Sequence, residues 1–104
     1  MPQSWRLSNA LESIVTEATT VLAAFAATAE GLLVLAQGMD ATATQALRRA
    51  IQLSAEVDLW DIVADLVDRL PEVARFRDDG ERLHELAAGM RRGTVSMHDA
   101  IASI

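Results

Sequence analysis

The chain has 104 residues, enough for one modest hydrophobic core, and 51% of them are apolar although only 4% are aromatic. Fifteen acidic residues against nine arginines and no lysine give a formal charge of −6, which disfavours binding to nucleic acid or to anionic lipid. The absence of cysteine excludes disulfide bonds, thiolate zinc sites and thiol nucleophiles. A composition rich in alanine and poor in aromatic residues predicts an all-α fold, a small bundle of four to five helices in a single domain spanning residues 1–104.

The first predicted element is a long helix that ends near Gly38. Its apolar residues recur at spacings of four and three over more than four heptads, at Leu7, Leu11, Ile14, Ala18, Val21, Phe25, Thr28, Leu32, Leu35 and Met39. Asn9 and Glu12 resemble a capping box, although the spacing of Leu7 allows a start as early as Ser4.

Shorter helices are expected in the rest of the chain. One begins near Asp40 or Thr42, another is capped by Asp58 and runs to Pro71, and whether residues 43–70 form one helix or two is open. Helical spacing continues from Pro71 to Arg92, where 78–80 can divide it, and Gly93 supplies a left-handed ending. A final short helix begins near Ser96.

Residues 21–36 form the most apolar stretch of the chain. A membrane span there would be marginal, because Glu30 costs roughly 2.5–3.5 kcal/mol near a bilayer centre. A signal peptide is disfavoured because Glu12 and Glu17 stand where a short basic segment is expected. We therefore expect no membrane span, and the cytoplasm is the default location.

A helix of thirty residues is about 45 Å long, too long for one small domain to cover on every side. We expect it to pack on the core and also to contact a partner protein or a second copy of the chain. The predicted interface residues are Leu11, Ile14, Val21, Phe25, Leu32 and Leu35, with Trp5 in the N-terminal segment. Small residues at Ala24, Gly31 and Gly38 would let another backbone approach. The alternative is a monomeric bundle whose first helix is bent or broken at Gly31.

Two polar patterns have the spacing of candidate metal sites. Asp58, Asp61, Asp65 and Asp68 share one side of a helix, which we interpret as a solvated face. Glu81 and His84 have the Glu-x-x-His spacing of ferritin-like metal sites. We expect the four aspartates, and likewise Glu81 and His84, to project away from the apolar face of the helix that carries them.

No catalytic, cofactor-binding or metal-binding residue is assigned, and enzymatic activity is not expected. The sequence favours a non-catalytic interaction module, a small soluble subunit or adaptor that associates with itself or with a larger protein. The alternative is a ferritin-like metal-binding protein assembled as a dimer or higher oligomer from Glu81, His84 and Glu30.

Overall fold

The structure is a computed structural model that describes the backbone of residues 2–104 and the side chains of residues 8–104. This part of the chain contains five α-helices, two short 3-10 helices and no β-strand, so the predicted all-α fold with a long N-terminal helix is confirmed. The elements are α1 (Pro2–Ala36), α2 (Asp40–Glu56), α3 (Trp60–Arg69), η1 (Leu70–Glu72), η2 (Ala74–Asp79), α4 (Gly80–Arg92) and α5 (Met97–Ala102).

Helix α1 is continuous over 35 residues. It runs through Asn9 and Glu12, so these residues do not form the predicted capping box, and it runs through Gly31 without a break. Threonine hydroxyls within it donate hydrogen bonds to the carbonyl four residues earlier, as Thr19 does to Val15 at 2.8 Å, which keeps these side chains satisfied without a partner helix. The alternative of a first helix broken at Gly31 is therefore wrong.

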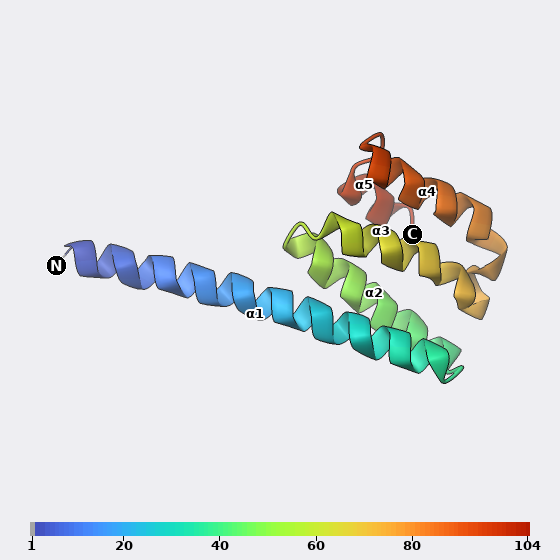
Figure 1. The fold of residues 1–104 in the computed structure, drawn as a ribbon, viewed down its shortest axis with the longest axis horizontal. Helices are drawn as coiled ribbons and strands as arrows, with labels where there is room; N and C mark the ends of the chain where they lie inside the picture. The colour runs from blue at the N-terminus through green and yellow to red at the C-terminus, as the bar shows by residue number, and fades with distance from the viewer. Residues whose placement is uncertain (1) are drawn as a thin grey trace.

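Helix α1 ends in a glycine turn that reverses the chain directly into α2. Gly38 has φ +75°, and the N–H groups of Gly38 and Met39 donate to the carbonyls of Leu35 and Val34. This is a Schellman ending, which requires a left-handed residue that glycine adopts without steric cost. Because the connection is so short, α2 folds back antiparallel along the second half of α1 (Figure 1).

The contact between α1 and α2 is made through small residues. Ala24, Ala27, Gly31 and Val34 are buried and lie on one side of α1, which we call the buried line of α1. A Cβ atom at Gly31 would lie 2.9 Å from Cδ2 of Leu47 and 3.4 Å from the backbone nitrogen of Leu47. The absence of a side chain at position 31 therefore lets Leu47 and the backbone of α2 lie close to α1.

Helices α2 and α3 are separate, which answers the question left open by the sequence. Asp58 has φ +57°, and the N–H groups of Asp58 and Leu59 donate to the carbonyls of Ala55 and Ser54. This is a second Schellman ending, with aspartate in the left-handed position. Leu59 rather than Asp58 occupies the N-cap position of α3, and no side chain makes the capping hydrogen bond.

The segment after Pro71 differs from the predicted α-helix. Val73 is extended, with ψ 136°, and it separates η1 from η2, so α-helical geometry begins only at Gly80. The later helix caps match expectation. Gly93, which follows α4, is left-handed, and Ser96, which precedes α5, accepts a hydrogen bond from the N–H of Asp99 at 3.1 Å.

The hydrophobic core lies between α2, α3 and α4, with α5 and the 3-10 helices at its margin. Its largest fully buried side chains include Leu47, Leu66, Leu70 and Leu83. We call α2–α5 with η1 and η2 the body. Helix α1 packs mainly on α2, and its N-terminal half extends well beyond the body (Figure 1). The molecule accordingly measures 59 × 33 × 16 Å, with a radius of gyration of 16.3 Å where about 13 Å is typical of a compact chain of this length.

Candidate interaction surface

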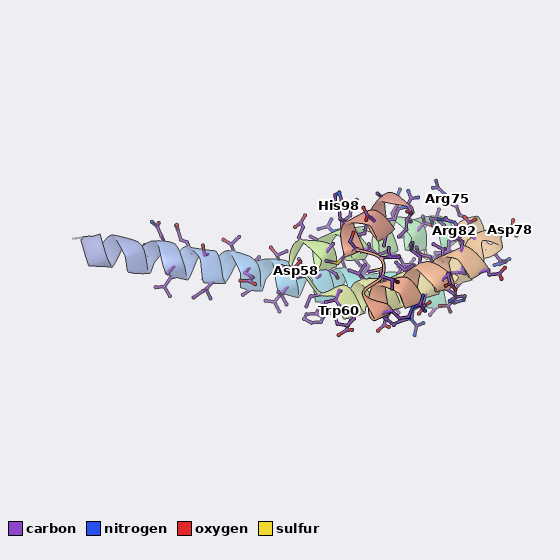
Figure 2. All side chains as sticks on the ribbon, turned by 90° about the horizontal axis from the view of Figure 1, so that it is seen from above. Asp58, Trp60, Arg75, Asp78, Arg82 and His98 are labelled. Atoms are coloured by element: carbon purple, nitrogen blue, oxygen red, sulfur yellow. The ribbon has the colours of Figure 1, made fainter. Side chains whose placement is uncertain are left out.

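The N-terminal half of α1 extends past the body, and only the residues that end α2 lie near it. Every described side chain from Ser8 to Thr19 is exposed, and the first buried residue along the helix is Ala24. Figure 2 shows these side chains standing free on both sides of the ribbon. An isolated helix of this length is only marginally stable in water, so a covering surface would stabilise it.

A row of apolar residues is exposed along almost the whole of α1. Its six large members are between 50% and 68% exposed. We call this row the apolar stripe; it consists of Leu11, Ile14, Val15, Ala18, Leu22, Phe25, Ala29 and Leu33. The stripe continues past the point where α2 begins to pack, because Phe25 and Leu33 are exposed although their neighbours Ala24 and Val34 are buried.

The apolar stripe and the buried line of α1 lie on opposite sides of the helix. At 3.6 residues per turn, the mean directions of the two sets differ by about 180°. The body therefore covers one side of α1 and leaves the apolar stripe facing away from it. Folding of the described chain does not hide these residues.

The side of α1 opposite the stripe is polar where it projects. Ser13, Thr16, Glu17 and Thr20 lie there, and they pass close to Val57 and the other residues that end α2. The projecting half is thus amphipathic, with an apolar face that has nothing against it and a polar face turned toward the side on which the body lies.

The predicted interface residues divide into two groups. Leu11, Ile14 and Phe25 belong to the apolar stripe. Val21, Leu32 and Leu35 are half-buried, and Leu35 packs against the core of the body. The side chain of Trp5 lies outside the described residues.

Five stripe residues lie outside the predicted set: the large residues Val15, Leu22 and Leu33, and the small residues Ala18 and Ala29. The heptad pattern has a period of 3.5 residues, whereas a straight α-helix has 3.6 residues per turn, so a strict heptad line rotates by about 20° per repeat around the helix. Followed from Leu11 to Leu35, that line turns from the exposed side toward α2. Counting at 3.6 residues per turn selects the exposed set.

The aspartates of α3 are only partly a solvated face. Asp68 accepts hydrogen bonds from Nδ1 of His84 at 2.8 Å and from Arg91, and a second nitrogen of Arg91 donates to Asp65 at 2.7 Å. These contacts join α3 to α4. Burial acts to raise the pKa of Asp68, but the hydrogen bonds and charges of His84 and Arg91 outweigh it and lower the pKa below the ordinary value of 3.8.

This network predicts a loss of stability in acid. Because folding lowers the pKa of Asp68, its ionised form stabilises the folded state above about pH 3.8, and this contribution is lost as the pH falls through the lowered pKa. We expect Asp68→Asn to reduce the free energy of unfolding by a few tenths to about 1 kcal/mol at pH 7, as for other partly exposed pairs. Urea unfolding at pH 7 and pH 2.5 measures this. The difference between the two proteins should be smaller at the lower pH, and an equal difference at both pH values would contradict the assignment.

Within one copy of the chain, the residues of the ferritin-like alternative do not converge. Glu30 is exposed on α1, whereas Glu81 and His84 are exposed on α4, and the His84 ring is engaged with Asp68. Across residues 8–104, no three His, Asp or Glu side chains are placed to hold a metal ion. Arg91 lies against both Asp65 and Asp68, so a positive charge already offsets these two carboxylates.

The remaining surface features have ordinary structural explanations. Arg48 and Arg75 lie with their guanidinium carbons 5.4 and 5.7 Å from the ring centre of the buried Phe76. A hollow between α2 and α5 is open to solvent and is lined by Arg48, Ile51, Gln52, Ile101 and Ile104, with no acidic or histidine side chain among them. Trp60 is 47% exposed at the start of α3, at the surface of the body (Figure 2).

Helix α1 also meets the length and composition expected of a membrane span. Within the described part of the chain it is the one helix that does so, over Ser8–Ala36, and only 22% of its most apolar window is buried. Core helices of soluble proteins and signal sequences meet the same criteria. Length and composition therefore do not distinguish a helix that contacts lipid from one that contacts protein. The distribution of polar and apolar residues around the helix is needed for that distinction.

No protein-family model, curated protein or solved structure matches this chain. The surface is therefore interpreted from its own geometry. Its distinctive feature is the unpartnered apolar stripe on α1.

Proposed function

We propose that this protein is a non-catalytic helical interaction module, a small soluble subunit that associates with itself through the apolar stripe of α1. The observation that carries the proposal is the exposure of this stripe from Leu11 to Leu33 on the side of α1 that faces away from the body. The cytoplasm is its proposed location.

The size of the stripe supports a stable contact. At roughly 100 Å² for each exposed large side chain, six such side chains amount to about 600 Å² per chain, which is as large as the largest patch on a typical monomer. Two copies in contact would bury about 1,200 Å², the lower bound for specific, stable interfaces.

The distribution of residues around α1 favours a protein partner over lipid. A membrane-spanning helix contacts lipid on all sides, whereas the projecting half of α1 carries Glu17 and three hydroxyl residues on one side. No arginine or lysine lies between Ser8 and Gln37 to attract an anionic membrane surface. An amphipathic helix of this kind can bury its apolar face against the apolar face of another amphipathic helix.

The proposal is tested by placing a charge in the stripe. Leu22→Glu puts a carboxylate at the centre of the proposed contact, where burying it unpaired is prohibitively costly. We expect light scattering to give a multiple of the 11.2 kDa chain mass for the unmodified protein and a single-chain mass for Leu22→Glu. Leu22 is 68% exposed, so the fold of one chain does not depend on it, and circular dichroism should show unchanged helix content.

Thr16→Glu is the matched control. Thr16 is also exposed on α1 but lies on its polar side, so the same charge should leave the mass of the complex unchanged. A single-chain mass for the unmodified protein at all concentrations would overturn the proposal. So would recovery of the unmodified protein in the membrane fraction together with release of Leu22→Glu.

A further inference from the structure

We propose that two copies of α1 pair antiparallel along the apolar stripe, about a two-fold axis level with Ala23 and Ala24. This inference rests on the proposed function and adds to it the orientation and alignment of the partner.

The body leaves the stripe free for contact over its full length. The buried line of α1 lies on the opposite side of the helix, so in a pair of α1 helices each body lies on the outside. The two helices can then touch from Leu11 to Ala36 without obstruction. Such a contact uses the same surface on both copies and closes at two chains, as two-fold interfaces do.

The alignment follows from the span of exposed apolar residues. On the side of α1 that carries the apolar stripe, and with the exposed Ala36 included, these residues run from residue 11 to residue 36, whose midpoint lies between Ala23 and Ala24. An antiparallel pair centred there brings the apolar residues of the two copies level with one another. The residues that lie opposite each other in the two copies are Leu11 and Ala36, Ile14 and Leu33, Val15 and Leu32, Ala18 and Ala29, and Leu22 and Phe25. Every large stripe residue is then level with an apolar residue of the second copy.

The antiparallel orientation follows from which half of α1 needs support. The projecting residues 8–19 become level with residues 28–39 of the second copy, the half that α2 holds in place. In a parallel pair the two projecting halves would have only each other, a two-stranded coil of under two heptads, which is too short to be stable alone. Antiparallel pairing also opposes the helix dipoles at each end.

The absence of cysteine makes a direct test possible. Ala18→Cys and Ala29→Cys are mild changes at exposed positions that the proposed pair brings face to face. In that pair two copies of residue 18 are about 16 Å apart along the axis, beyond the reach of a disulfide bond. We expect oxidation to link the chains when the two variants are unfolded and refolded together, and each variant alone to stay unlinked.

The outcomes separate the orientation from the proposed function. Linking within each variant alone, without the 18-to-29 link, would show parallel pairing and overturn this inference while self-association stands. A protein with the mass of two chains in which no disulfide bond forms would overturn the proposed alignment of residue 18 with residue 29. A single-chain mass in every sample would overturn both proposals. Adding Leu22→Glu to each cysteine variant is the control for random collision, and it should abolish the link.

Discussion

Replacing Leu47 by alanine is expected to lower the free energy of unfolding by about 2–5 kcal/mol, as large-to-small changes in well-packed cores do. Leu47 has no exposed surface, and its side chain fills the space between α1 and the core of the body. A chain of this length has a total stability of only about 5–15 kcal/mol. The variant should therefore be the most sensitive to urea of those considered.

Urea unfolding followed by circular dichroism measures this effect, with all proteins at one chain concentration because self-association adds to apparent stability. Gln45→Ala is the control, since Gln45 is exposed on the same helix and its truncation leaves no cavity. A loss of less than about 1 kcal/mol for Leu47→Ala would show that α1 and α2 are not packed as described.

Gly31→Leu is expected to lower the free energy of unfolding by about 2 kcal/mol or more. Leucine gains roughly 1 kcal/mol in helix propensity over glycine, so the change would be neutral or favourable on an open surface. At position 31, however, even the first carbon of a side chain would lie 2.9 Å from Leu47, and the backbone of α2 lies directly behind it. The added side chain must therefore push α1 away from α2.

The same urea measurement tests this, and Glu30→Leu serves as its control. Glu30 is the adjacent residue and is exposed, so leucine there should change stability by no more than about 0.5 kcal/mol. A Gly31→Leu protein as stable as Glu30→Leu would contradict the close approach of the two helices.

The sequence predicted the helix ends that depend on the chemistry of a single residue. Gly38, Gly93 and Ser96 act as expected, because left-handed turns and hydroxyl caps are properties of single residues. Asp58 was assigned the wrong role, since aspartate suits both an N-cap and a left-handed turn and only the chain path distinguishes them. The segment after Pro71 keeps helical spacing but is 3-10, which spacing alone does not reveal.

The candidate surface could be predicted in kind but not in full detail. The excess of apolar residues on α1 indicated that one small chain cannot cover it. Which of these apolar residues face outward depends on which side of α1 packs against α2. That side is set by the contact between Gly31 and Leu47, which lie on different helices. The link from Asp68 to His84 and Arg91 was missed for the same reason, because the residues lie on different helices.

The central claim, that another polypeptide covers the apolar stripe, is tested most directly by amide hydrogen exchange of residues 8–19. Every described side chain of this segment is exposed, and within one copy of the chain only the residues that end α2 lie near it, so its amides should be strongly protected only if a partner helix holds them in place. We predict exchange at least about tenfold slower in the unmodified protein than in Leu22→Glu. Equally fast exchange in both proteins, with the amides of α2–α4 still protected, would contradict the account.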